Sequence, residues 1–404
     1  MTSSRPPSYR RGDHGPAVID IRVKLAGVGL LERPDVLGDA GLALFDDECD
    51  LAVRRFQQQR GITVDGVVGP LTYRTLDEAC WTLGDRVLSY APGRLMRGDD
   101  VAALQGRLLS MGFDCARVDG VFGVETDAAL RDFQRNVGLV ADGICGPDTL
   151  ESLERLARTI SGGAPQGLRE SVAIARSGPT LAGKVMVIDP GHGGQDRGAV
   201  AHDLDETELV EDLAARVEGR LLALGVIAYL TRPVSGPGTG TPPELDQDET
   251  RHHRTMASEE ARAAFANAAR ADLVLSLHTG GWRDPAAAGV ASYYYGNDRF
   301  GHFSEVGRRL ADLVQRELVA RTDLVDCRTH PKTWDLLRRT RMPAVRVELG
   351  YLTNPGDSAR LAEPEFRDLI AEGLIVAVQR LYLPPEDDAP TGVLHLPELA
   401  ALGR

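Results

Sequence analysis

The sequence predicts an α/β domain, with a mixed and mostly parallel sheet flanked by helices, preceded by two small three-helix modules. Two observations predict this arrangement. One sequence pattern occurs twice within about the first 155 residues, and from Lys184 onward apolar runs of strand length alternate with amphipathic helices. The 404 residues suffice for several domains, and the composition, 43% apolar and 26% charged, is that of a folded globular chain.

The charge and the cysteine content exclude several classes of protein. The formal net charge of −13 disfavours nucleic acid or an anionic membrane surface as the main partner. No apolar run approaches the roughly 18 residues that span a bilayer. The N-terminal segment has no apolar stretch behind its arginines, so no secretory signal is expected. Five cysteines without paired spacing indicate a reducing compartment rather than a disulfide scaffold or a thiolate zinc site, and the expected location is the cytoplasm.

The repeated pattern joins an Arg-Gly-Asp tripeptide, a Phe-Gln pair and an Asp-Gly turn followed by Gly-Pro. Each copy has apolar residues on one face of a first helix, and a second helix that leads into the Phe-Gln pair. A short third helix begins at Pro70 in one copy and at Pro147 in the other. The copies are assigned to residues 1–80 and 90–156. The pattern alone also fits a helical packing module that binds no ligand.

The residues within this pattern resemble the peptidoglycan-binding repeat found beside cell-wall hydrolases. The second copy has the expected Gln105, Asp119 and Gln134. The first copy departs from the repeat, because Arg22 stands where a glutamine is expected and Asp46 where a glycine is expected. The resemblance implies glycan binding by the second copy, and either glycan binding or a protein-contact surface for the first.

Beyond the repeats, a linker of residues 157–183 precedes the α/β domain at 184–383, and a flexible tail of residues 384–404 follows. The apolar runs of the domain predict five strands, over Val185–Asp189, Val226–Thr231, Leu273–Leu277, Val290–Tyr295 and Ala344–Glu348. The segments between them predict helices over Leu209–Leu224, Glu259–Ala269 and Phe303–Arg321. Alternation of this kind favours one sheet with helices over it.

Polar side chains stand at the carboxyl ends of three of these strands. His192 follows the first strand in a glycine-rich turn, His278 ends the third and Glu348 ends the last. Because such ends converge on one rim of an open sheet, these residues are expected to lie together. Neutral imidazoles and one carboxylate, with a fourth position for water, are a ligand set for zinc. A glutamate that closes an apolar strand is costly to bury without a partner, which favours a functional role for Glu348.

Several acidic residues follow the first histidine, and helical geometry selects one of them. At about 100° per residue, Glu206 lies roughly 60° from the apolar Leu209, whereas Glu208 and Glu211 lie about 100° and 160° away. Glu206 therefore leans toward the sheet from the first turn and is the expected third ligand. The other two glutamates are expected to face solvent.

Five separated blocks of this domain resemble, in order, the zinc-dependent N-acetylmuramoyl-L-alanine amidases of the amidase-3 type. The blocks are Val187–Ala199, Glu206 at the start of its helix, Arg262 with Asn267, Ser276–His278 and Pro343–Asn354. The resemblance covers about residues 184–383. It implies hydrolysis of the amide that joins N-acetylmuramic acid to its stem peptide. His192, Glu206 and His278 would be the zinc ligands, and Glu348 the catalytic acid and base.

The same resemblance implies supporting roles in the site for Asp189, Arg262 and Asn267. The sequence also departs from the family in two places. The usual His-Ala-Asn-Ala run is here His278 followed by Thr-Gly-Gly, and a long insertion occupies Ser235–Ser258. Both departures bear on catalytic efficiency rather than on zinc binding.

The order of the domains also resembles that of the actinobacterial CwlM proteins, which implies a second class of function. Such a protein is a cytoplasmic, phosphorylation-dependent regulator of peptidoglycan precursor synthesis that activates the UDP-N-acetylglucosamine enolpyruvyl transferase, with weak or no amidase activity. Its partners would include that transferase, a Ser/Thr kinase and a phosphothreonine-reading domain, with Thr391 in the tail as a candidate phosphorylation site. A phage endolysin is a third alternative. In each case peptidoglycan fragments or precursors are the expected ligands.

Overall fold

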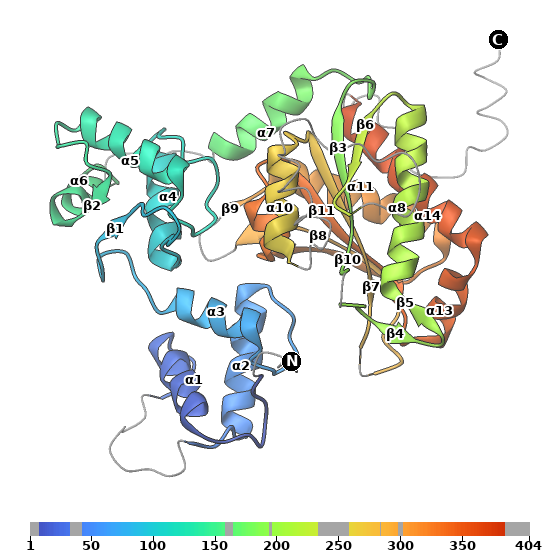
Figure 1. Cartoon of the computed structure of the whole chain (residues 1–404), viewed down its shortest axis with the longest axis horizontal. Coiled ribbons are helices and arrows are strands. Elements are labelled where there is room, and N and C mark those ends of the chain that lie inside the picture. The colour runs from blue at the N-terminus through green and yellow to red at the C-terminus, as the bar shows by residue number, and fades with distance from the viewer. Residues whose placement is uncertain are drawn as a thin grey trace. The chain divides into compact units, whose positions relative to one another are not determined.

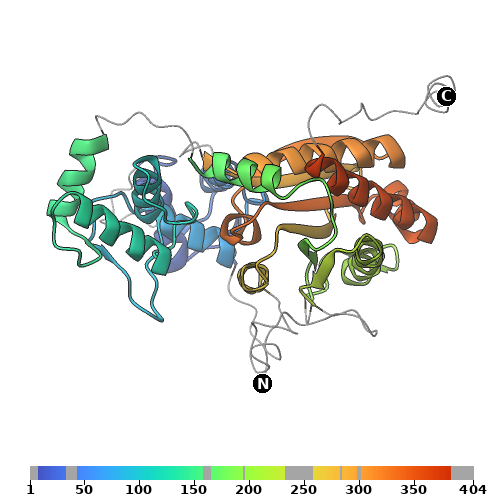
Figure 2. The same cartoon turned by 90° about the horizontal axis from the view of Figure 1, so that it is seen from above.

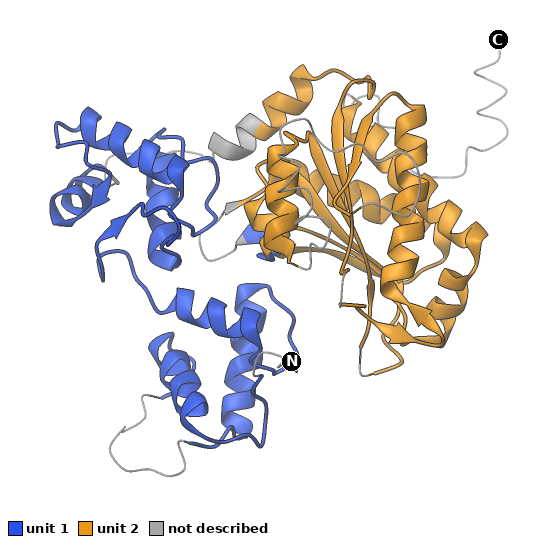
Figure 3. Cartoon of the chain, in the orientation of Figure 1, with its two compact units in different colours: residues 1–166, 296–302, 332–334 blue, residues 167–295, 303–331, 335–404 orange. Residues whose placement is uncertain are grey.

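The computed structural model describes residues 8–32, 43–157, 165–193, 196–232, 258–282, 284–297 and 302–383. The chain divides into two compact units, which Figure 3 distinguishes by colour. The first comprises residues 1–166 with 296–302 and 332–334, and the second comprises the other residues from 167 onward. No helix within the described ranges is long and apolar enough to cross a bilayer. Thr391 and nearly all of the Ser235–Ser258 insertion lie outside the described residues.

The first unit contains both copies of the repeated pattern, and the described residues of each copy form three helices, which Figure 1 labels. In the first copy they are α1 (Pro16–Gly27), α2 (Asp47–Arg60) and α3 (Pro70–Ala79). In the second copy they are α4 (Asp99–Ser110), α5 (Val124–Asn136) and α6 (Pro147–Ala157). A short antiparallel pair joins β1 (Leu88–Ser89) to β2 (Ile144–Cys145). The predicted apolar face of the first helix is present in both copies, and its residues are fully buried: Val18, Ile21 and Leu25 in α1, and Val101, Leu104 and Leu108 in α4.

A buried glutamine holds an Asp-Gly turn at three places in these copies. Gln134 Nε2 donates to Asp142 Oδ1 at 2.8 Å, and Gln134 Oε1 accepts from the Gly143 amide at 2.9 Å. Gln57 and Gln105 make the equivalent pair of contacts, each with its own Asp-Gly turn. One side chain thus satisfies both a carboxylate and a backbone amide, which keeps each turn in place without an apolar contact.

Arg22 stands where the first copy lacks its second glutamine. Arg22 Nη1 lies 2.7 Å from Asp46 Oδ1 and 3.3 Å from the Leu44 carbonyl oxygen. The arginine side chain is only 11% exposed, whereas that of Asp46 is 36% exposed, so the ion pair is partly open to water. Its contacts hold the loop before α2. Arg22 and Asp46 are the two departures from the repeat noted in the sequence of the first copy, and in the structure they contact each other.

The second unit is built on one mixed sheet. Within the described residues its strand order is β10-β8-β11-β7-β3-β6, with β9 paired to β8. The strands are β3 (Val185–Pro190), β6 (Ile227–Leu230), β7 (Leu273–Gly280), β8 (Val290–Asn297), β9 (His302–Phe303), β10 (Asp326–Lys332) and β11 (Ala344–Tyr351). The strands from β11 through β7 and β3 to β6 are parallel, whereas β8 is antiparallel to β11. The predicted α/β class with a mostly parallel sheet is confirmed.

The helices of this unit lie on the two faces of the sheet. They are α7 (Pro165–Arg176), α8 (Glu206–Ala223), α10 (Glu259–Ala268), α11 (Glu305–Thr322), α12 (Asp335–Arg339), α13 (Pro355–Ala362) and α14 (Pro364–Tyr382). Apolar residues of α8, α11 and α14 form one core with Met186 and Ile188 of β3. Side chains alternate along a strand, so Asp189 points to the opposite face, where α10 lies. Figure 2 shows α10 on the side of the sheet away from α11 and α14. A hairpin of β4 (Val200–Ala201) and β5 (Leu204–Asp205) leads into α8.

Candidate metal centre

His192 lies in the turn that follows β3, at the carboxyl end of the sheet. Its backbone has a φ of 60°, in the left-handed region. The turn also needs Gly191, because a Cβ at that position would lie 2.2 Å from Cε1 of His278. His192 Nδ1 is 2.8 Å from Asp196 Oδ2, and Nε2 is 3.1 Å from Glu206 Oε1. One ring nitrogen is thus oriented by a carboxylate while the other faces the proposed site.

Glu206 is the first residue of α8 and is only 2% exposed. Its Oε1 accepts from the Thr279 amide at 2.9 Å and lies 3.2 Å from His278 Nδ1. Its Oε2 accepts from the Ala199 amide at 2.8 Å. Gly198 keeps this space open, since a Cβ there would lie 2.4 Å from Oε2. The first turn of the helix therefore carries Glu206 onto the rim, as the helical geometry predicted.

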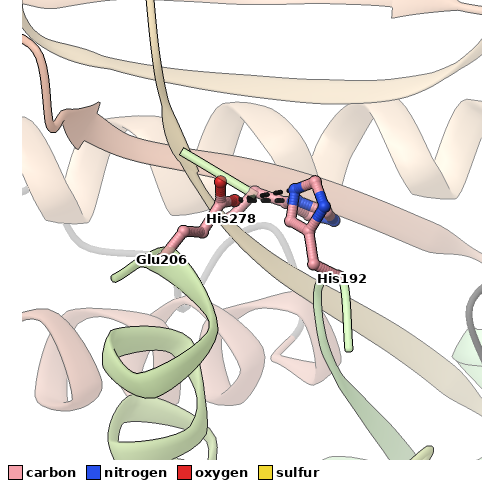
Figure 4. Close-up of side chains that lie close together, drawn as sticks. All are labelled: His192, Glu206 and His278. Atoms are coloured by element: carbon pink, nitrogen blue, oxygen red, sulfur yellow. Dashed lines mark hydrogen bonds and ion pairs between the residues drawn. The ribbon is translucent and has the colours of Figure 1, made fainter. Parts of the chain in front are cut away.

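His278 lies on β7 and is 2% exposed, and its Nε2 atom is buried without a hydrogen-bond partner among the described residues. One ligand atom from each of His192, Glu206 and His278 can be chosen so that all three lie within 4.8 Å of one another. Figure 4 shows the carboxylate of Glu206 facing both imidazoles. Two imidazoles and a carboxylate are a donor set that suits zinc, and a buried, unsatisfied ring nitrogen is costly unless it is coordinated. The residues present fit a zinc ion.

The three side chains also perturb one another electrostatically. Burial raises the pKa of Glu206, but hydrogen bonds and attraction from the two histidines outweigh it and hold that pKa well below its usual range. Burial lowers the pKa of His192, yet Glu206 and Asp196 raise it by more. Burial and the nearby positive charge of Arg346 lower the pKa of His278. The ionised Glu206 and the neutral His278 are in the protonation states that metal ligands require, whereas the raised pKa of His192 means that a bound ion would have to displace its proton.

Glu348 lies on β11, the strand next to β7 in the sheet. It is the register partner of His278 in this parallel pair, so both side chains project from the same face at the same level. Glu348 is 9% exposed. Its Oε1 accepts from Arg346 Nη2 at 2.7 Å and from Arg346 Nε at 3.0 Å. The sheet therefore places a buried, ion-paired carboxylate beside the candidate metal ligands.

Two of the three expected supporting residues lie beneath this rim. Asp189 is fully buried and accepts hydrogen bonds from Thr231 Oγ1 and Ser276 Oγ, both at 2.6 Å. Arg262 of α10 lies 3.4 Å from the same carboxylate. Burial raises the pKa of Asp189, but Arg262 and its other partners hold the net pKa below the usual value. This buried ion pair joins α10 to the end of β3.

Asn267 lies elsewhere. Its Nδ2 donates to the Arg339 carbonyl and its Oδ1 accepts from the Arg341 amide, both at 2.8 Å. Asn267 therefore holds the turn that leads into β11, and both ends of its amide are engaged there rather than with the candidate metal ligands. Its effect on the site is indirect, through the position of that strand.

Three residues near the site were not singled out from the sequence. Asp196 orients His192, and Arg346 binds Glu348. Arg232 donates from Nη2 to the Gly191 carbonyl at 3.0 Å and forms an ion pair with Glu211, which is therefore not simply solvated as expected. Arg346 left a signal in the sequence, because an arginine two residues before a strand-end glutamate shares its face.

The fold and this site define a class of protein. Residues 186–380 match the N-acetylmuramoyl-L-alanine amidase family, and residues 14–76 and 97–153 match a putative peptidoglycan binding domain. The chain belongs to the N-acetylmuramoyl-L-alanine amidase family, as its motifs predicted.

One relative matches nearly the whole chain. The sequence is 47% identical over 402 residues to the N-acetylmuramoyl-L-alanine amidase CwlM of Mycobacterium tuberculosis, covering 98% of this chain and 94% of that protein. It is 29% identical over 210 residues to the germination-specific N-acetylmuramoyl-L-alanine amidase of Bacillus subtilis, covering 52% of this chain and 84% of that protein. Among solved structures, the N-acetylmuramoyl-L-alanine amidase from Clostridium difficile 630 aligns at 25% identity with a TM-score of 0.40, over 49% of this chain and 95% of that one.

Proposed function

We propose that the protein is a zinc-dependent hydrolase of the amide bond between N-acetylmuramic acid and L-alanine, acting on peptidoglycan or its precursors. One observation carries the proposal: His192, Glu206 and His278 bring three ligand atoms within 4.8 Å of one another, and Glu348 is the register partner of His278. This arrangement supplies both a metal donor set and a nearby proton carrier.

The residues divide the work by their chemistry. His192, Glu206 and His278 would hold the metal, and Asp196 would keep the His192 ring in its orientation. A zinc ion bound there would lower the pKa of water to about 7 and would polarise the substrate carbonyl. Glu348 would accept a proton from the attacking water and return it to the departing L-alanine nitrogen. The expected products are a free lactyl carboxylate and a free peptide amine.

The test is to incubate the purified full chain, loaded with a measured amount of zinc, with muropeptides and with lipid-linked precursors. Release of stem peptide that depends on zinc supports the proposal. A chain that binds zinc but hydrolyses none of these substrates refutes it.

A second proposal concerns regulation in the cytoplasm. The chain would bind and activate an enolpyruvyl transferase under control of a Ser/Thr kinase and a phosphothreonine-reading domain, with Thr391 as the modified residue. What supports it is the resemblance to the CwlM proteins; the Arg22–Asp46 pair, which replaces a glutamine contact of the second copy, shows only that the two copies differ. The near-full-length relative is a bacterial protein, which favours either proposal over a phage endolysin.

Affinity capture from lysate tests this second proposal. The wild type, Thr391→Ala and a chain that ends at Leu383 are compared. Loss of the transferase or of the phosphothreonine reader from both altered chains supports it. Equal recovery by all three excludes the tail as the switch.

A further inference from the structure

Arg346 is held between two carboxylates beside the proposed site. Its Nη2 and Nε donate to Glu348 Oε1 at 2.7 and 3.0 Å, and its Nη1 donates to Glu259 Oε1 at 2.9 Å. The arginine side chain is 16% exposed and that of Glu348 is 12% exposed, so little water competes for these hydrogen bonds. Charge-assisted bonds of this kind are stronger and more directional than neutral ones.

The two carboxylates come from different elements. Glu348 is on β11, and Glu259 opens α10 on the face of the sheet where Asp189 and Arg262 also lie. Arg346 therefore ties β11 to α10, the helix that covers this face of the sheet. Because three of its nitrogen donors already hold carboxylates, the guanidinium is built into the protein rather than open for a ligand.

The two carboxylate oxygens of Glu348 therefore have different hydrogen-bonding surroundings. Oε1 receives both hydrogen bonds from Arg346, whereas Oε2 accepts none from the described residues. A carboxylate that transfers a proton needs a free lone pair aimed at the reacting atoms. With Oε1 held by Arg346, the Glu348 side chain keeps one orientation. In that orientation Oε2 is the oxygen that can transfer the proton.

We propose that Arg346 is a positioning residue for the amidase reaction: it anchors Glu348 through Oε1, so that Oε2 is the oxygen that takes and returns the proton. This inference rests on the proposed function, because it assigns a role within that reaction. Arg346 itself does not touch the substrate. Its effect appears in the rate of the chemical step and not in substrate or zinc binding.

The proposal predicts how far kcat falls when Arg346 is replaced. A misplacement of about 1 Å in a reacting group costs on the order of 10²-fold in rate. Arg346→Met removes both anchoring bonds, so kcat is expected to fall by roughly 30- to 100-fold with KM and zinc content unchanged. Arg346→Lys keeps the charge but cannot donate from two fixed nitrogens, so its kcat is expected to lie between those of Arg346→Met and the wild type.

Arg380→Met is the matched control. Arg380 is 17% exposed and lies 2.9 Å from the buried Glu317 on the opposite face of the sheet, between α14 and α11. Its loss is expected to lower thermal stability and to leave kcat unchanged. A fall in kcat for Arg346→Met that exceeds the fall for Arg380→Met at equal stability is therefore specific to the site. If Arg346→Met does not fold, Arg346→Lys decides.

A second measurement does not depend on turnover. Acetohydroxamate binds zinc and donates a hydrogen bond to a neighbouring carboxylate, so its affinity for the zinc-loaded chain reports where Glu348 points. Arg346→Met and Glu348→Gln are each expected to weaken binding about tenfold, and the double variant no further than either alone. A wild type that loads zinc but hydrolyses no substrate refutes the proposed function, and the acetohydroxamate affinities then still test the anchoring. Equal kcat or, in an inactive protein, equal acetohydroxamate affinity in the wild type and both Arg346 variants overturns the positioning role.

Discussion

Replacing Gly191 by alanine is expected to disable the metal centre without unfolding the domain. The new Cβ would lie 2.2, 2.4 and 2.5 Å from Cε1, Nδ1 and Nε2 of His278. Favourable contact between heavy atoms begins near 3.5 Å, so the ring has to retreat by roughly 1 Å. His278 is 2% exposed, so its ring cannot relieve the contact by moving into solvent. The contact between the ring and Glu206 is therefore expected to break.

The size of the effect follows from that displacement. Changes that only disturb the orientation of a metal ligand typically cost about 10- to 100-fold in metal affinity, which corresponds to about 1.4 to 2.8 kcal/mol. Gly191→Ala keeps every ligand side chain, so it tests geometry rather than ligand identity. Zinc affinity is measured by competition with a chromophoric chelator, and folding by circular dichroism and thermal unfolding.

Gly219→Ala provides the comparison, because it adds the same methyl group to an exposed position of α8 with nothing nearby. It is expected to leave zinc affinity unchanged and to raise stability slightly, as alanine does in a helix interior. If folded Gly191→Ala binds zinc as tightly as the wild type does, the close approach of Gly191 to His278 does not shape the centre, and the reasoning fails.

The other predictions concern ligand identity, chemistry and the repeats. The double variant His192→Ala and His278→Ala is expected to contain no zinc on elemental analysis, and undiminished zinc would contradict the assigned ligands. Glu348→Gln is expected to keep zinc and fold while amide hydrolysis falls by about 10² or more, and a full rate in the muropeptide assay would remove Glu348 from the mechanism. Gln134→Ala is expected to lower the unfolding free energy of the second copy by about 1 to 3 kcal/mol, because the buried Gly143 amide loses its acceptor. The loss is measured by urea unfolding, and a change below about 0.5 kcal/mol would show that the Asp142–Gly143 turn is stable without the glutamine.

The residues of this candidate site could be proposed from the sequence because the relevant signals are local. Glu206 could be chosen by its angle on the helix, and His192, His278 and Glu348 by their places at strand ends. Asn267 could not be placed in this way, because its partners lie in a turn more than 70 residues further along the chain. Sequence spacing carries no information on such a contact.

The strand β10 and the helix α14 are absent from the elements predicted from the sequence, for a reason different from the one that applies to Asn267. The β10 strand has no apolar run, and its residues alternate between exposed and half-buried. The other strands were predicted from apolar runs, so β10 could not be predicted in the same way. The α14 helix buries Phe366, Ile370, Leu374, Val378 and Leu381, which recur at a helical period. The sequence therefore carries a signal for this helix, but the helix follows the last strand and lies outside the strand–helix alternation from which the other helices were predicted. Strand pairing, which decides the case of β10, is a property of the folded chain.

The order in which the sheet is completed has a consequence for the synthesis of the protein. The β11 strand lies between β7 and β8 and pairs with both, yet both of these neighbours precede it in the chain. A nascent or truncated chain that stops before Ala344 has two strand edges facing a space that nothing yet fills. Unpaired edges are templates for pairing with other chains. Such a fragment, although it contains His192, Glu206 and His278, is expected to aggregate or be degraded rather than to persist as a small metal-binding protein.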